Sequence, residues 1–391
     1  MSKFKRVIAI VLDSAGIGAM PDAEAWGDGG TDTLGHVCEY RALRLPHMAS
    51  LGLGNIRPLS HIDPSKNPLG AYGKMTLASN GKDTAAGHWE MAGILTEVPF
   101  PTYPQGFPPR IVEPFEKAIG RNILGNYPAS GTEIIKELGE EHMKTGCPIV
   151  YTSGDSVFQI AAHEDVIPVP ELYRMCETAR AILDGPDRVG RVIARPFVGT
   201  PGNFRRTERR HDYAIDPPKP MLLDIMQEHG LKVLAVGKIK DIYCGRGITE
   251  HLKMKNNAEG MEHTIAAAQT DDFDMIFTNL VDFDMNYGHR RDVEGYANAL
   301  EEFDRQLGQL LEVFPQDDLL LITADHGCDP TYLKTADHTR EYVPLLAYSK
   351  SARGNVNLGT RETLSDMGQT IAENFGLTLP RGKSFLSALK S

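Results

Sequence analysis

The fold class of this chain is decided by residues 319–327, LLLITADHG. The segment opens with an apolar run and turns polar at Asp325 and His326. A short continuous apolar run bounded by polar or glycine residues is typical of a strand buried on both faces, as in a parallel sheet. We therefore predict a buried strand over residues 319–323, with an aspartate and a histidine just past its carboxyl end.

Three further segments show the same pattern, at residues 7–12, 233–236 and 275–280. Between the last of these and residue 319 lies the stretch 292–314, in which apolar residues recur at helical spacing. A strand, a helix and a second strand in this order form a crossover unit. The sequence therefore predicts an α/β protein with a doubly wound core.

Two proline-rich stretches divide the chain, at residues 99–109 (PFPTYPQGFPP) and 216–220 (DPPKP). The section between them has strand-like segments and a predicted helix around residues 171–183, and strands of the core type stand on both sides of it. With 391 residues, the chain is also longer than a usual single core. We predict a core made of residues 1–98 and 219–391, with an α+β cap domain, residues 99–218, inserted into it.

The composition indicates a compact protein, because apolar residues make up 41% and charged residues 24% of the chain. A formal net charge of −11 disfavours binding to nucleic acid or to anionic membranes. No apolar stretch is long enough to span a bilayer. The five cysteines are widely spaced and the first apolar run stops at Asp13. We therefore expect reduced thiols, no signal peptide and a cytoplasmic location.

Acidic and histidine residues follow the predicted strands. Because ligands bind beyond the carboxyl ends of the strands in open α/β sheets, three strands would bring these groups to one rim. Three carboxylates and three imidazoles can form two sites of three protein ligands each, with positions left for a nucleophile and a phosphate oxygen. Such ligands suit Mn²⁺, Zn²⁺ or Mg²⁺. The six residues are Asp13, Asp284, His289, Asp325, His326 and His338.

Taken singly, each of these residues has a simpler interpretation. An aspartate after a strand often caps a helix, and a lone histidine often makes a structural hydrogen bond. The combination of six favours a metal site. A binding protein stabilised by metal ions, without turnover, is the alternative to an enzyme.

A candidate nucleophile lies in residues 79–93, SNGKDTAAGHWEMAG. Asp83 can cap a helix that begins at Thr84, and helix N-termini attract anions. A threonine hydroxyl is a poor nucleophile at neutral pH, but two metal ions beside it would lower its pKa. Without the metal residues, Thr84 would be interpreted as part of a capped turn. A purely structural metal site would not need a hydroxyl there.

Together these segments resemble the motifs of a known family. The strand ending in Asp13 and the segments GKDTAAGHWE, VDFDMNYGHRRD, TADHGCDPT and ADHTREYVP are similar to the metal and nucleophile motifs of the alkaline phosphatase superfamily. In detail they resemble its phosphopentomutase family, and the resemblance covers nearly the whole chain. It implies an alkaline-phosphatase-like core and an isomerase that interconverts ribose 1-phosphate and ribose 5-phosphate, and likewise the 2-deoxyribose phosphates. It also implies a pair of Mn²⁺ ions, a phosphothreonine intermediate, and activation by a sugar bisphosphate such as glucose 1,6-bisphosphate.

Residue by residue, the resemblance implies that Thr84 is the phosphorylated nucleophile and a bridging ligand. It places one metal on Asp13, Asp325 and His326, and the other on Asp284, His289 and His338. Asp282 would share a face with Asp284 if the strand continued, so the residues alone do not choose between these two. The family pattern favours Asp284.

The cap is expected to bind the sugar and the distal phosphate. Ser153 and Asp155 can hydrogen-bond to ribose hydroxyls, a solvated loop being the alternative. Arginines crowd residues 188–197 and 205–213, and guanidinium forks bind phosphate in a bidentate manner, although most of these arginines are surface charges. The resemblance favours Arg191 and Arg206, with Lys238 from the core.

Two other enzyme types of the superfamily share the metals and the nucleophile: a metal-dependent phosphomonoesterase and a phosphoglycerate mutase. Threonine as the nucleophile and the length of the chain favour the pentose enzyme, by resemblance. The expected partners are small sugar phosphates. The sequence leaves the oligomeric state open.

Overall fold

The computed structural model describes residues 4–154 and 156–389. The chain forms two compact units. The core unit comprises Met1–Val98 and Pro217–Ser391, and the cap unit comprises Pro99–Asp216. The chain therefore leaves the core once and returns to it once, at the two proline-rich stretches.

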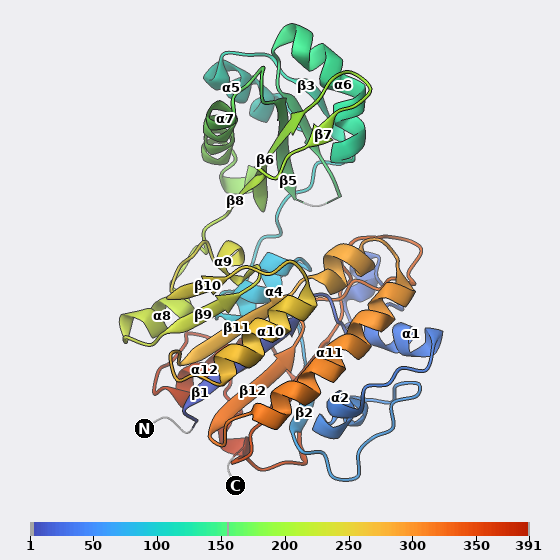
Figure 1. Cartoon of the computed structure of the whole chain (residues 1–391), viewed down its shortest axis with the longest axis vertical. Coiled ribbons are helices and arrows are strands. Elements are labelled where there is room, and N and C mark those ends of the chain that lie inside the picture. Colours follow the sequence, from blue (N-terminus) through green and yellow to red (C-terminus); the bar gives the residue numbers. More distant parts are fainter. Residues whose placement is uncertain (1–3, 155, 390–391) are drawn as a thin grey trace. The chain divides into compact units, whose positions relative to one another are not determined.

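The core unit is built on one eight-stranded sheet (Figure 1). Its strands lie in the order β10-β9-β11-β1-β12-β13-β2-β14. The strands from β10 to β12 are parallel to one another, whereas β13 is antiparallel to both β12 and β2. Their bounds are β1 Arg6–Leu12, β2 Ala71–Met75, β9 Val233–Val236, β10 Glu250–Leu252, β11 Met275–Leu280, β12 Asp318–Thr323, β13 Val343–Tyr348 and β14 Val356–Arg361.

The four strands expected from the sequence are β9, β11, β1 and β12, which are consecutive in the sheet. Every residue of these four strands is buried. This burial explains why their sequences are continuous apolar runs rather than alternating ones. The predicted doubly wound, alkaline-phosphatase-like α/β core is confirmed by the sheet and by the family and structural matches described below.

The core helices fall into two groups that follow from the direction of each crossover. From β1 to β2, from β10 to β11 and from β11 to β12 the chain moves along the sheet toward β14, and right-handed crossovers put these helices on one face. From β2 to β9 and from β9 to β10 it moves back, so the opposite face is covered. The first group is α1 Thr33–Tyr40, α2 Pro46–Leu51, α3 Leu53–Ile56, α10 Asn257–Ala268 and α11 Val293–Val313. The second is α4 Thr84–Met91, α8 Leu222–Glu228 and α9 Ile239–Ile242. Helix α12 Ser365–Asn374 follows the last strand and packs with α4 and α8.

Figure 1 shows α10 and α11 side by side in front of the core sheet. The predicted helix 292–314 is α11, and its start is fixed by Asp292, whose side chain accepts a hydrogen bond from the backbone nitrogen of Gly295 at 2.8 Å. Within residues 4–154 and 156–389, none of the helices combines the length and the apolar character needed to cross a bilayer.

The cap unit contains helices and its own sheet of mixed parallel and antiparallel strands, in the order β3-β4-β5-β6-β7, with β8 paired to β6. Helices α5 and α7 pack over one apolar cluster that includes Phe115 and Phe158, and α6 packs over another that includes Ile134 and Phe197. The bounds are α5 Pro109–Ile119, β3 Leu124–Pro128, α6 Gly131–Thr145, β4 Ile149–Thr152, β5 Val157–His163, α7 Val169–Ile182, β6 Arg191–Val198, β7 Arg205–Arg206 and β8 His211–Ala214.

Candidate metal centre

The carboxyl ends of β11, β1 and β12 bring the predicted metal ligands together. These three strands are neighbours in the sheet, and Asp13, Asp284 and Asp325 all follow their ends. The six predicted ligands form two groups whose ligand atoms lie within 4.8 Å of one another in each group. The rim expected from the sequence is therefore a real cluster of side chains.

The first group is Asp13, Asp325 and His326, all fully or almost fully buried. Nε2 of His326 lies 3.4 Å from Oδ1 of Asp13 and 3.3 Å from Oδ2 of Asp325. Nδ1 of the same ring is 3.0 Å from the carbonyl oxygen of Gly327, and this contact leaves Nε2 to face the carboxylates.

The second group is Asp284, His289 and His338. The two Nε2 atoms of the histidines lie 3.1 Å apart, and each is close to the Asp284 carboxylate, at 3.3 Å for His289 and 3.4 Å for His338. The carbonyl oxygen of Ala336 is 2.7 Å from Nδ1 of His289, so this ring is also oriented by its outer nitrogen.

Both groups fit a divalent cation. Oδ1 of Asp13 and Oδ1 of Asp284 are buried and accept no hydrogen bond from the described residues, which is costly for a carboxylate unless a positive charge is close. Burial and the neighbouring Asp325 carboxylate raise the pKa of Asp13 well above its usual value. Burial opposes the charged form of His289, but the Asp284 carboxylate raises its pKa to about 12. Buried oxygen and nitrogen donors that favour positive charge are the ligands expected for Mn²⁺, Zn²⁺ or Mg²⁺.

Thr84 lies at the start of α4, next to the first group. Oγ1 of Thr84 is 3.2 Å from Nε2 of His326. The helix is capped by Asp83, whose side chain accepts a hydrogen bond from the backbone nitrogen of Ala86 at 3.1 Å. The hydroxyl therefore stands at a capped helix N-terminus, where backbone N–H groups favour a phosphate.

The backbone conformation after β11 shows which of Asp282 and Asp284 belongs to the second group. The strand β11 ends at Leu280, and Phe283–Gly288 form a π-helical turn, so the two aspartates do not share a strand face. Asp282 instead accepts a hydrogen bond from the backbone nitrogen of Asn257 at 2.7 Å, at the start of α10. Only Asp284 lies with His289 and His338.

Two supporting residues were missed by the sequence analysis, His88 and Asn279. Asn279 donates a hydrogen bond of 2.8 Å to Oδ2 of Asp13. Nδ1 of His88 lies 2.9 Å from the carbonyl oxygen of Thr84 and 3.1 Å from Oδ2 of Asp325. His88 could have been predicted from its position, because residues one helical turn apart lie on the same face and His88 follows Thr84 by four residues. The position of Asn279 inside an apolar strand gave no such indication.

Lys238 follows β9 and stands at the start of α9. Its charge acts on Asp13, where it lowers the pKa against the stronger effect of burial. Lys238 thus lies near the first group, and it follows the end of a strand as Asp13 and Asp325 do.

The cap residues predicted to bind substrate lie on or beside the cap sheet. Arg191 is on β6, with Nη1 3.7 Å from the Asp212 carboxylate, and Ser153 follows β4. Arg206 is on β7, and its charge lowers the pKa of the buried Tyr151, which burial raises. Asp155 lies outside the described residues.

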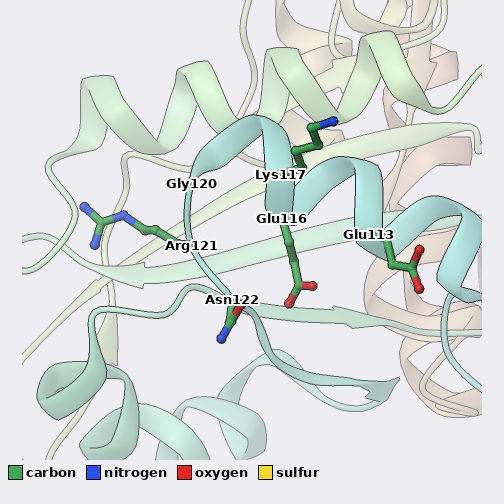
Figure 2. A pocket seen from close by; sticks show the side chains of 6 residues that line it. All are labelled: Glu113, Glu116, Lys117, Gly120, Arg121 and Asn122. Carbon is green, nitrogen blue, oxygen red and sulfur yellow. The ribbon is translucent and has the colours of Figure 1, made fainter.

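The cap also has an open pocket of about 450 Å³ at the C-terminal end of α5 (Figure 2). Its lining is mostly charged and consists of Glu113, Glu116, Lys117, Gly120, Arg121 and Asn122. None of the described substrate-binding candidates lines it, so we do not assign the substrate to this pocket.

The chain is similar to known metalloenzymes. The family described as the metalloenzyme superfamily matches residues 5–379. A phosphopentomutase of Caldanaerobacter subterraneus subsp. tengcongensis is 60% identical over 98% of this chain and 98% of its own length. A phosphopentomutase of Desulfitobacterium hafniense is 57% identical over 98% of this chain and 100% of its own length.

Among solved structures, a protein of Pyrococcus horikoshii matches with a TM-score of 0.51 at 15% identity, over 97% of this chain and 99% of its own. This match bears on the fold alone. The matches in sequence are much stronger and span both units. The chain therefore belongs to the metalloenzyme superfamily and, within it, to the phosphopentomutase family.

Proposed function

We propose that this isomerase interconverts ribose 1-phosphate and ribose 5-phosphate, and the corresponding 2-deoxyribose phosphates, through a phosphothreonine at Thr84. The observation that carries the proposal is the position of Thr84, whose hydroxyl at a helix N-terminus is 3.2 Å from a side chain of a buried ligand cluster. Similarity to phosphopentomutases over nearly the whole chain supports the choice of substrate.

The two ligand groups would each hold one divalent ion, for which we propose Mn²⁺. Asp13, Asp325 and His326 would hold one, and Asp284, His289 and His338 the other, with Thr84 at both. When bound, such ions lower the pKa of a coordinated hydroxyl and neutralise charge on a transferring phosphoryl group. The chain itself contributes the orientation of each ring through its Nδ1 contact and the support of Asp13 by Asn279.

The reaction begins with the phosphorylated Thr84. The free hydroxyl of the bound pentose monophosphate attacks phosphorus, the bond from phosphorus to Oγ1 of Thr84 breaks, and the proton lost by the sugar hydroxyl is balanced by one gained at Oγ1. The product is a pentose bisphosphate. Its other phosphate then returns to Thr84 by the same exchange in reverse, so phosphate is conserved and the isomer is released.

Two phosphate-binding regions are required by this cycle, because both ends of the bisphosphate must be held. Thr84 and the ligand groups serve the reacting phosphate. We assign the distal phosphate to Arg191 and Arg206 of the cap and to Lys238 of the core, and the sugar hydroxyls to Ser153 and Asp155. Guanidinium forks suit a phosphate, and hydroxyl and carboxylate groups suit ribose.

The division of labour follows the two units: residues 1–98 and 219–391 carry the chemistry, and residues 99–218 carry substrate contacts. We also propose a cytoplasmic location for the enzyme, because its five cysteines are free and thiols stay reduced in that compartment. A sugar bisphosphate such as glucose 1,6-bisphosphate would act as the activator by placing the first phosphate on Thr84.

The test is to remove phosphate from the Mn²⁺-loaded protein, confirm this by intact mass, and add ribose 5-phosphate with and without glucose 1,6-bisphosphate. We expect ribose 1-phosphate to form at full rate only after the bisphosphate is added. Full-rate isomerisation without it would contradict the phosphothreonine cycle. Stoichiometric release of inorganic phosphate would identify a phosphomonoesterase instead.

A further inference from the structure

The loop that leads into Thr84 is held by a buried arginine from the segment that carries His338. Arg340 is 4% exposed and lies two residues after His338. Its Nη1 donates hydrogen bonds to the carbonyl oxygens of Ser79 and Gly81, both at 2.7 Å. One guanidinium nitrogen thus binds two points of the loop that precedes the Thr84 helix.

The rest of the guanidinium is fixed as well. Nε and Nη2 of Arg340 bind the Asp22 carboxylate at 3.1 Å and 3.0 Å. The guanidinium carbon stands over the ring of Trp26, 5.1 Å from its centroid. A planar group with bonds on two sides and an aromatic ring at its face has a single orientation.

A second contact closes the same loop from its other end. The buried Asp28 carboxylate accepts a hydrogen bond from the backbone nitrogen of Arg340 at 2.9 Å and binds Nζ of Lys82 at 2.8 Å. Residues 79–82 are therefore tied to residue 340 by side-chain and backbone bonds, directly before the Asp83 cap and Thr84.

We propose that Arg340 is a positioning residue that sets the place of Thr84 relative to the ligand groups. Loops without repeating backbone bonds take their position from such contacts. Because His338 and Arg340 belong to one short segment, a shift of the arginine changes the distance between the nucleophile and the second ligand group. The inference rests on the proposed role of Thr84 in phosphoryl transfer.

The physical reason that the residue must be arginine is geometric. A lysine has one nitrogen and cannot bind two carbonyl oxygens and a carboxylate on opposite sides at once. Arg340→Lys keeps the charge but releases part of the loop. Displacement of a reacting group by about 1 Å can cost on the order of a hundredfold in rate, while substrate binding elsewhere is unchanged.

The core offers a matched control in Arg361. It also binds a carboxylate, Asp366 at 2.7 Å, and a carbonyl oxygen, that of Lys383 at 2.7 Å, and its guanidinium carbon is 5.8 Å from the centroid of Phe385. These contacts lie at the C-terminal part of the core and do not include the Thr84 loop. Arg361→Lys therefore reports the general cost of this substitution.

The experiment compares the full-length, Mn²⁺-loaded wild type with Arg340→Lys and Arg361→Lys. Bound metal, KM and kcat for ribose 5-phosphate, and the rate at which glucose 1,6-bisphosphate labels Thr84 are measured. For Arg340→Lys we expect the wild-type amount of metal, KM within about twofold, and both kcat and the labelling rate lower by about tenfold or more. Arg361→Lys should stay within about twofold of the wild type.

Asp22→Asn is the second variant. It removes the charge of a side chain that is 45% exposed, and asparagine has nearly the same volume, so no cavity forms. It should lower the same two rates by a smaller factor, about threefold. Equal kcat values for the two lysine variants, a fall in kcat that follows lost metal, or wild-type rates in Asp22→Asn would each overturn the inference. If the wild type takes no phosphate on Thr84, the proposed function fails as well. This result differs from the three outcomes above, so the two failures can be told apart.

Discussion

Oγ1 of Thr84 lies 3.2 Å from Nε2 of His326, although 242 residues separate the two in the chain. The contact is possible because α4 packs directly on the backbone at the end of β12. A Cβ atom at Gly87 would stand 2.3 Å from the carbonyl oxygen of Asp325. Glycine at this position allows the helix that carries the nucleophile to approach the strand that carries the ligands.

Gly87→Ala should therefore separate Thr84 from His326. The obstacle is a backbone atom, so the helix must move by several tenths of an ångström or more, and we expect kcat to fall by about tenfold to a hundredfold. Steady-state kinetics together with the melting temperature provide the measurement. Wild-type kcat in a folded Gly87→Ala protein would show that the close approach is not needed.

Thr84→Val should abolish turnover and covalent labelling while the fold is kept, because a methyl group replaces the hydroxyl at a part-buried site. Intact-mass spectrometry after incubation with bisphosphate gives the answer. Thr178→Val is the control, since Thr178 is also helical and its Oγ1 donates a hydrogen bond to the carbonyl oxygen of Arg174, far from the ligand groups in the sequence. If Thr84→Val still gains the mass of one phosphoryl group in the same peptide, Thr84 is not the nucleophile.

Metal binding should divide between the two groups. Asp284→Asn is expected to lose one ion per chain selectively, and Asp13→Asn the other, because each carboxylate belongs to one group. Metal counting after dialysis measures this. Asp282→Asn is the matched control, because Asp282 serves the start of α10, and it should keep the wild-type metal content. Retention of all metal in both ligand variants would refute the assignment.

Arg206→Met should raise the ratio of phosphate release to isomerisation, because the bisphosphate would be held at only one end. The neighbouring Arg205 is on the same two-residue strand, and adjacent strand residues point to opposite faces. Arg205→Met is therefore the control and should leave the ratio unchanged. Measuring inorganic phosphate and ribose 1-phosphate in one reaction tests the pair, and equal ratios would remove Arg206 from the substrate site.

Arg6→Met should destabilise the core strongly. Arg6 and Asp318 form a buried ion pair at 2.5 Å, 3% and 1% exposed, and Arg6 also binds three backbone carbonyl oxygens near the end of α10. Removing one partner leaves an uncompensated buried charge, for which we expect a loss of about 3–5 kcal/mol in unfolding free energy. Urea unfolding measures it, and replacing Asp318 by leucine in the same protein should recover part of the loss.

The sequence predicts the sheet well where burial is complete. Strands β1, β9, β11 and β12 are covered on both faces, so their apolar runs have no competing interpretation. Strand β2 alternates buried and half-buried residues, and its pairing with β14 is irregular between Asn357 and Gly359. This edge of the sheet therefore gave no clear signal in the sequence. The antiparallel β13 is buried except at Tyr348, and nothing in its sequence sets its direction.

The candidate site was predictable only in its reactive groups. Asp13, Asp325 and His326 could be predicted because they are metal-binding residue types at the end of a predicted strand. Asn279 and Arg340 could not, because their roles depend on hydrogen bonds to residues 266 and 259 positions away in the chain. Such distances are fixed by the fold as a whole. The π-helical turn at Phe283–Gly288 shows the same limit, because it turns Asp284 toward the histidines in a way that strand periodicity does not describe.

The pairing of β1 with β11 has a consequence for how the chain is made. Val7 pairs with Met275, and Val7–Leu12 have no side-chain exposure in the finished core. At about 5–20 residues per second, translation delivers the partner strand on the order of 10 to 50 s after β1. The cap, Pro99–Asp216, is continuous and is complete well before that moment. On the ribosome, then, the unit in the middle of the gene can fold first, while the first apolar segment of the protein stays without its partner strand for that interval.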